Sequence, residues 1–143
     1  MPYANDYSFR EIEENAEFSH LYTITDAVYQ ALVAVFQDQS PVHVDEEYAK
    51  SAGFAGRVMH GAILQGFLSH FVGMHFPGKK SLILSVNLNY HRPSYLGDKI
   101  NLTARVRQKV ETGQVVVLEV KFTNLSSEAL AASGKVQVAL RNE

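Results

Sequence analysis

The sequence predicts an α+β fold in which an antiparallel β-sheet wraps around one long, buried helix. Two observations support this prediction. Residues 61–72 are apolar over most of a helical circumference, which is typical of a helix that is buried rather than lying on a surface. Later in the chain, four segments alternate apolar and polar residues, as strands with one buried face do. Because short turns connect these segments, we expect neighbouring strands to pair antiparallel and to cover the helix as a second layer.

The N-terminal stretch is polar and acidic, and it contains scattered aromatic and aliphatic anchors. These anchors are Tyr3, Tyr7, Phe9, Ile12 and Phe18. We expect residues 1–21 to form an extension along the edge of a single domain that spans residues 1–143, although the pattern does not define its structure. The stretch has no apolar run of the length that a signal peptide or a membrane span needs, which favours a cytoplasmic protein.

A first helix is expected from Thr25 or Asp26 to about Gln37. Either Thr25 or Asp26 can cap it by accepting a hydrogen bond from an unpaired backbone N–H. Apolar residues recur on one face of this helix, at Val28, Leu32, Val35 and Phe36. Pro41 then lacks a backbone donor and favours an extended residue before it, so residues 38–43 are expected to form a loop.

Two more helices are expected before the strands. Residues 45–47 are acidic and suit the first turn of a short helix ending near Ser51, because carboxylates stabilise the positive end of a helix dipole. The long apolar helix is expected from His60-Gly61 to just before Gly73.

The strands are expected at about residues 84–90, 100–106, 116–122 and 136–140. In the first of them, the alternation places Leu84, Val86, Leu88 and Tyr90 on one face. The intervening residues are polar, so each strand should bury one face only.

The composition limits the classes of function. The chain is 46% hydrophobic and 20% charged, as an ordinary globular domain is. A formal charge of -2 gives no basic excess, so nucleic acid and anionic membranes are not expected partners. The chain has no cysteine, which excludes a disulfide framework, a thiolate zinc site and a cysteine nucleophile.

Several short motifs occur in the order found in one known family. The segment Asp38-Gln39-Ser40-Pro41-Val42-His43 resembles the hydratase motif of the MaoC-like dehydratases, which include the (R)-specific enoyl-CoA hydratases. The resemblance continues through residues 57–64, 76–78, 90–93 and 97–98, and covers about residues 22–140. It implies a hot-dog fold, in which the sheet wraps the central helix, and a hydro-lyase that acts on trans-2-enoyl thioesters without a cofactor.

The resemblance assigns roles to six residues. It implies that Asp38 and His43 are an acid/base pair and that the backbone N–H of Gly61 holds the enolate oxygen. This suits the reaction, because hydration needs a base for water, an acid for the α-carbon and a donor for the developing oxyanion. Ser69, His60 and Ser40 are expected near the substrate; His60 is expected to pack under the start of the helix. Ser40 stands where the family usually has Asn, and this departure could alter the pocket.

Several alternatives remain open at this point. The carrier could be CoA or acyl-carrier protein, and the sequence does not decide which of Asp38 and His43 is the base. Hot-dog thioesterases often use a carboxylate on the central helix, but residues 61–75 contain neither Asp nor Glu. A non-catalytic acyl-thioester-binding module is a further alternative. No metal site is expected, since His70 and His75 lack the usual ligand spacing. An unpaired strand edge and the resemblance both predict a homodimer or higher homo-oligomer.

Overall fold

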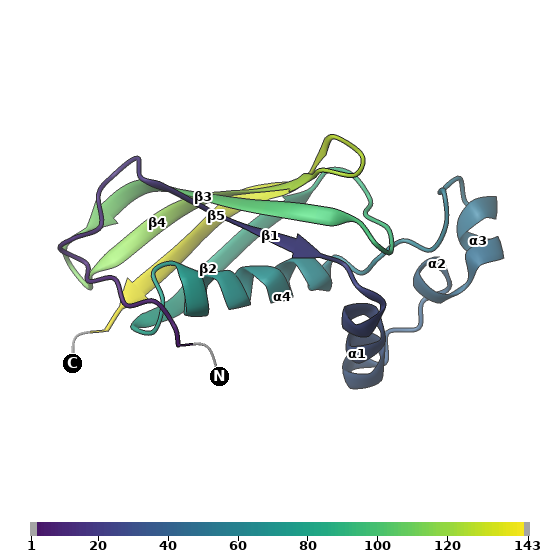
Figure 1. The fold of residues 1–143 in the computed structure, drawn as a ribbon, viewed down its shortest axis with the longest axis horizontal. Coiled ribbons are helices and arrows are strands. Elements are labelled where there is room, and N and C mark those ends of the chain that lie inside the picture. Colours follow the sequence, from purple (N-terminus) through teal and green to yellow (C-terminus); the bar gives the residue numbers. More distant parts are fainter. Residues whose placement is uncertain (1–2, 142–143) are drawn as a thin grey trace.

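In the computed structural model, which describes residues 3–141, an antiparallel sheet curves around helix α4 (Figure 1). The sheet has five strands, in the order β1-β3-β4-β5-β2. The strands are β1 (Glu17–Thr23), β2 (Ser81–Tyr90), β3 (Lys99–Val110), β4 (Val115–Asn124) and β5 (Ala129–Leu140). The predicted α+β architecture, with a sheet wrapped around a central helix, is therefore confirmed.

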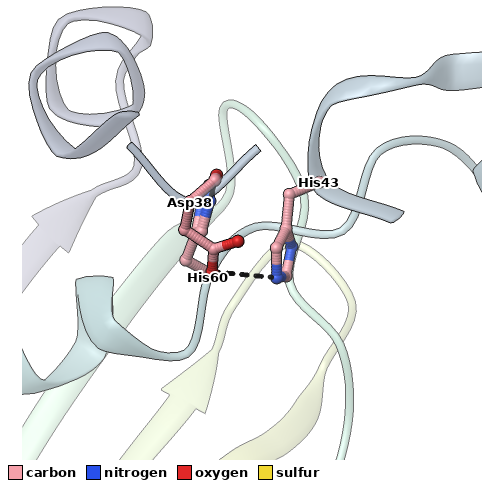
Figure 2. A group of neighbouring side chains, drawn as sticks. All are labelled: Asp38, His43 and His60. Carbon is pink, nitrogen blue, oxygen red and sulfur yellow. Dashed lines mark hydrogen bonds and ion pairs between the residues drawn. The ribbon is translucent and has the colours of Figure 1, made fainter. Parts of the chain in front are cut away.

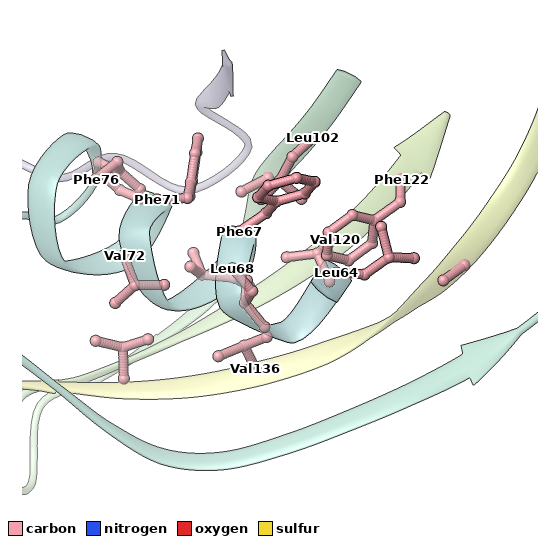
Figure 3. Close-up of a cluster of buried hydrophobic side chains, with 14 of the residues drawn as sticks. Leu64, Phe67, Leu68, Phe71, Val72, Phe76, Leu102, Val120, Phe122 and Val136 are labelled. Atoms are coloured by element: carbon pink, nitrogen blue, oxygen red, sulfur yellow. The ribbon is translucent and has the colours of Figure 1, made fainter. Parts of the chain in front are cut away.

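The central helix forms the inner layer of the fold. Helix α4 (Ala62–His70) continues directly into one π-helical turn, η1 (Phe71–His75). Phe67, Leu68 and Phe71 lie in one buried cluster with side chains of the strands (Figure 3). The strand residues of this cluster include Leu102, Val120, Phe122 and Val136. Burial of these apolar groups is the main force that holds the helix in the sheet.

Three short helices lie together beyond one end of the sheet (Figure 1). Helix α1 (Asp26–Phe36) begins at Thr25, whose Oγ1 accepts a hydrogen bond from the N–H of Val28 at 3.1 Å, and ends at Gln37 in a left-handed conformation. Helix α3 (Glu46–Ser51) begins at Asp45, whose carboxylate accepts from the N–H of Tyr48. Both predictions are confirmed.

The loop predicted for residues 38–43 is only partly correct. Helix α2 (Pro41–Val44) occupies its second half and forms a single turn. Pro41 is at the start of this turn, where its missing N–H is not required and its fixed φ angle favours a helix. The consequence is that His43 lies on a helix rather than on an extended loop.

The sequence pattern did not reveal the first strand. Strand β1 pairs with β3 from Glu17 opposite Arg105 to Thr23 opposite Lys99, so part of the predicted extension belongs to the sheet. Its inward-facing residues are Phe18, His20 and Tyr22, opposite the buried residues Ala104, Leu102 and Ile100. A histidine and two aromatic residues do not give the aliphatic alternation of the other strands, which explains the omission. Of the predicted anchors, Phe9 and Ile12 are buried and Tyr3 is exposed.

Strand β2 is an edge strand with an irregular register. The pairing with β5 shifts between Ile83 and Ser85, so Ile83 lies opposite buried Val138 and Val86 lies opposite buried Val136. The prediction that Leu84 shares a face with Val86 is therefore wrong, because the bulge at Leu84 interrupts the alternation. Leu82, Leu84 and Val86 are all exposed on this edge. None of the helices in residues 3–141 is long and apolar enough to span a bilayer.

Candidate active site

A pocket of about 410 Å³ opens at the N-terminal end of α4. His43, His60 and Gly61 line it on the helical side, and Tyr90 and Ser94 line it on the side of β2 and the following loop. Most of the exposed lining is apolar, with contributions from Ile24, Met59 and Leu64. A pocket of this size with a few polar groups at one end is suited to a small organic substrate.

Asp38 and His43 face each other beside this pocket, as Figure 2 shows. Asp38 follows α1, and His43 is on α2. The Asp38 Oδ2 atom lies 3.9 Å from the His43 Nε2 atom. Asp38 itself is largely exposed and is not part of the pocket lining, so the pair joins the pocket through His43.

A hydrogen bond fixes which nitrogen of His43 carries the proton in the neutral ring. The Nδ1 atom lies 2.6 Å from the carbonyl oxygen of Val58. Because a carbonyl oxygen can only accept, Nδ1 must be the donor, and Nε2 presents a lone pair toward Asp38. In this tautomer, His43 can take a proton at Nε2.

Ser40 holds the Asp38 carboxylate in its ionised form. The Ser40 hydroxyl donates to Asp38 Oδ1 at 2.6 Å, and the backbone N–H of Ser40 donates to the same atom at 3.1 Å. These hydrogen bonds, the side-chain one first, lower the pKa of Asp38, and the partial burial of the carboxyl opposes them only weakly. Ser40 is thus in contact with the acid/base pair and not with the pocket lining.

His60 connects both members of the pair. It is only 4% exposed, and its Nε2 atom lies 2.9 Å from the main-chain oxygen of Asp38. Its ring stacks on that of His43, with centroids 4.0 Å apart and planes 27° apart. His60 is thus buried immediately before the central helix, and its contacts reach both members of the pair.

The sequence pattern missed Tyr29. The Tyr29 side chain is 3% exposed, and its hydroxyl donates to the main-chain oxygen of His43 at 2.7 Å. The apolar face predicted for α1 included Val35 and Phe36, but both are exposed. Tyr29, together with Leu32 and Val33 at i+3 and i+4, could have indicated the face that is turned inward.

Gly61 immediately precedes α4 and borders the pocket. A Cβ atom at this position would lie 3.0 Å from Cε1 of Tyr90, which is too close for an unstrained contact. The Tyr90 hydroxyl in turn donates to the Gly61 carbonyl oxygen at 3.2 Å and accepts from Gln65 Nε2 at 3.0 Å. The backbone N–H groups at such a helix start are unpaired donors, so they can stabilise negative charge in the pocket. Ser69 lies further along α4, is exposed, and does not line the pocket.

Asp38, His43 and His60 also have the composition of a metal site. Each offers one ligand atom, and the three atoms lie within 4.8 Å of one another. Two imidazoles and one carboxylate can hold a divalent transition metal. Two of these residues, Asp38 and His43, are also the pair that an acid/base mechanism needs, so a metal held here would compete with that mechanism.

Three other histidines lie at the far end of the central helix, whereas His91 lines the pocket. His70 and His75 pack around His20 of β1, and the Tyr22 hydroxyl lies 2.9 Å from His70 Nδ1. Burial, and then the neighbouring His20 and His70, lower the pKa of His75; burial raises the pKa of Tyr22 to about 12. This cluster fastens β1 to the helix and is not part of the pocket.

Comparison with known proteins identifies the family of this chain. The family model of the MaoC like domain matches residues 8–127. The match begins earlier than the resemblance expected from the sequence, because it includes β1.

Two relatives and one solved structure are similar over most of the chain. The (R)-specific enoyl-CoA hydratase of Rhodospirillum rubrum is 26% identical over 133 residues, which are 93% of this chain and 92% of the relative. The mitochondrial 3-hydroxyacyl-[acyl-carrier-protein] dehydratase of Arabidopsis thaliana is 28% identical over 115 residues, or 79% of this chain and 68% of the relative. The unliganded R-hydratase PhaJ1 of Pseudomonas aeruginosa superimposes with a TM-score of 0.88 at 24% identity, covering 98% of this chain and 89% of that structure.

Proposed function

This chain belongs to the MaoC-like domain family, and we propose that it catalyses the (R)-specific, reversible hydration of trans-2-enoyl thioesters. The observation that carries this proposal is the separation of 3.9 Å between Asp38 Oδ2 and His43 Nε2 beside the pocket. A water molecule makes hydrogen bonds of about 3 Å, so one water can bridge both atoms. The names of the relatives as enoyl-CoA hydratase and acyl-carrier-protein dehydratase support the same class of reaction.

His43 is the base in the proposed mechanism. Its Nδ1–H is engaged by Val58, and its Nε2 has a free lone pair. An imidazole holds a proton more tightly than a carboxylate does, and the hydrogen bonds from Ser40 make Asp38 an even weaker proton acceptor. His43 Nε2 therefore takes a proton from the bridging water, while the Asp38 carboxylate orients that water and stabilises the resulting imidazolium.

The bond changes follow from this arrangement. The water oxygen attacks the β-carbon of the enoyl thioester, and the C=C electron pair moves toward the thioester oxygen to give an enolate. The backbone N–H of Gly61 stabilises that oxygen, a contribution of roughly 2.7–4 kcal/mol for one such donor. The His43 imidazolium then returns the proton to the α-carbon, which regenerates the neutral imidazole and completes the addition of one water.

The acyl carrier and the assembly also belong to this proposal. CoA is the first expectation, and the carrier-protein thioester named for the Arabidopsis relative is the second. We expect a homodimer or higher homo-oligomer, supported by the exposed Leu82, Leu84 and Val86 on the open edge of β2. A cytoplasmic location is expected as well, consistent with the lack of cysteine.

The test is the loss of enoyl-thioester absorbance when the protein is incubated with crotonyl-CoA and with longer trans-2-enoyl-CoAs. The wild-type protein should hydrate at least one of them to the (R)-3-hydroxyacyl product. Asp38→Asn and His43→Ala should each lose on the order of 10²–10⁴-fold in kcat, because His43→Ala removes the base and Asp38→Asn removes the charge that orients the water and stabilises the imidazolium. His43→Ala should be at least as damaged as Asp38→Asn if His43 is the base.

Two other outcomes would overturn the proposal. Release of free thiol in place of hydration would identify a thioesterase, although residues 61–75 offer no carboxylate for that reaction. Binding of acyl-CoA without turnover, in a folded protein, would identify a non-catalytic thioester-binding module.

A further inference from the structure

His60 contacts both Asp38 and His43. Its Nε2 lies 2.9 Å from the Asp38 carbonyl oxygen, which can only accept, so Nε2 carries the proton. The neutral ring then has its lone pair on Nδ1, which is buried and has no hydrogen-bond partner. A buried acceptor without a partner is unfavourable. The neutral ring therefore keeps the hydrogen bond from Nε2 to Asp38 although its Nδ1 lone pair has no partner.

The contact with Asp38 joins an irregular segment to the buried start of the central helix. Residues 37–40 form no regular secondary structure, and Asp38 is exposed. The hydrogen bonds from Ser40 fix the carboxylate relative to its own loop, and the backbone N–H of His43 donates to the Ser40 carbonyl oxygen at 2.8 Å. These bonds are all local to the motif; the His60 N–H adds the link from the Asp38 main chain to the buried residue that precedes Gly61.

The face of the His60 ring supports the second member of the pair. The two imidazoles stack at a centroid distance of 4.0 Å, and the Val58 carbonyl holds the His43 ring by its Nδ1–H. At the His43 end of the motif, the Tyr29 hydroxyl donates a hydrogen bond to the main-chain oxygen of His43. The Tyr29 ring lies 5.9 Å from that of His60. Two buried side chains thus fasten the two ends of the segment from Asp38 to His43.

We propose that His60 is a positioning residue for the hydration reaction, acting through both Asp38 and His43. This inference rests on the proposed function of that pair. His60 does not transfer the proton itself; its N–H sets the place of the Asp38 main chain, and its ring face sets the plane of the His43 imidazole. A shift of about 1 Å in a reacting group can cost roughly 10²-fold in rate, so the effect should fall on kcat and leave KM nearly unchanged.

Three variants separate the two contacts. His60→Gln retains an N–H donor that can reach the Asp38 carbonyl, whereas His60→Leu fills the space without a donor or an aromatic ring. Tyr29→Phe removes only the hydroxyl at the other end of the motif. His70→Leu is the matched control, because His70 lies on the same helix but away from the pocket.

The readouts are kcat, KM and the melting temperature of each folded variant with its best enoyl thioester. We expect kcat to fall about 10²-fold in His60→Leu and clearly less in His60→Gln, with KM within about threefold of wild type. Tyr29→Phe should show a smaller fall in kcat, and His70→Leu none. Equal kcat for wild type and a folded His60→Leu protein would overturn the inference, as would losses in both His60 variants that simply follow a reduced melting temperature.

A second measurement does not depend on activity. Long-range ¹H–¹⁵N spectra of the histidine rings distinguish the two neutral tautomers, and they should show His60 protonated at Nε2 and His43 at Nδ1. In His60→Leu, the His43 ring signals should broaden or divide, because the ring loses the face that holds its plane. Unchanged His43 signals in His60→Leu would contradict the inference, whether or not the wild-type protein is active. Failure of the wild-type protein to hydrate any thioester would instead count against the proposed function.

Discussion

At the scale of single residues, Ser40 contacts the Asp38 carboxylate at the position where the sequence departs from the family pattern. The family usually has Asn before the proline, and Ser40 lacks the two-donor amide. Its hydroxyl and backbone N–H nevertheless both donate to Asp38 Oδ1. A single hydroxyl thus supplies the side-chain hydrogen bond that stabilises the ionised carboxylate.

Removing that hydroxyl should raise the pKa of the Asp38 carboxyl. The Ser40 hydrogen bonds lower the pKa of Asp38, so the carboxylate stays ionised to a lower pH than usual. In Ser40→Ala the pKa of Asp38 should rise toward its ordinary value, because the hydroxyl donor is lost and only the backbone N–H remains. The measurement is a ¹³C NMR titration of the Asp38 carboxyl carbon in the folded protein between about pH 2 and 6, with Ser51→Ala as a control in the nearby helix α3. The same Asp38 titration midpoint in wild type and Ser40→Ala would show that the Ser40 hydroxyl does not set the ionisation of Asp38.

At the scale of secondary-structure elements, the start of α4 is the part of the fold on which the chemistry depends. Gly61 brings the backbone to the pocket, and Tyr90 of β2 packs directly against it. The hydroxyl of Tyr90 also joins the Gly61 carbonyl oxygen to Gln65 on the helix. The proposed oxyanion donor is therefore held by an edge strand as well as by its own helix.

Gly61→Ala should reduce kcat by roughly 10²-fold, because the new methyl group would lie 3.0 Å from the Tyr90 ring and would displace the amide or the substrate. The double variant Gly61→Ala/Tyr90→Leu should recover part of that loss, since the smaller side chain relieves the contact. Steady-state kinetics of the two single variants and the double variant measure the coupling. Strictly additive losses would show that Tyr90 does not restrict this position.

At the scale of the whole molecule, the two edges of the sheet differ. Strand β1 closes one edge and packs its inner face on α4 and η1 through aromatic and histidine side chains. Strand β2 is the other edge strand, and its side chains Leu82, Leu84 and Val86 are exposed. A second copy of the chain can pair with an exposed apolar edge strand. Substitutions on β1, the opposite edge strand, can serve as the control.

Leu84→Lys should shift the protein toward the monomer, because a charge on the β2 edge opposes strand pairing between two copies. The same substitution at Leu21 of β1, a residue with 49% exposure against 53% for Leu84, should leave the assembly unchanged. Analytical ultracentrifugation at several concentrations measures both. Dissociation by Leu21→Lys instead would place the interface on β1, and a monomeric wild-type protein would exclude the expected dimer at these concentrations.

The sequence by itself determined the presence of the central helix, the starts of α1 and α3, the four later strands and the motif that contains Asp38 and His43. The predicted end of the central helix before Gly73 is wrong, because the helix continues through Gly73 to His75 as a π-helical turn. Each of the correct predictions depends on local signals: apolar periodicity, Thr25 as a cap, Asp45 at a helix start, and a motif within six consecutive positions. Such signals act between residues that are close in the chain, so they can be read without the fold.

Only the tertiary structure decided the role of β1, the bulge at Leu84 and the contacts of His60 and Tyr29 with the acid/base pair. Strand β1 lies far in sequence from β3, its partner, and its inner face carries His20 and Tyr22 in place of aliphatic residues. His60 reaches Asp38 across 22 positions and Tyr29 reaches His43 across 14. These contacts form because burial of α1 and α4 brings their ends together, and burial acts on the folded chain as a whole, not on neighbouring residues.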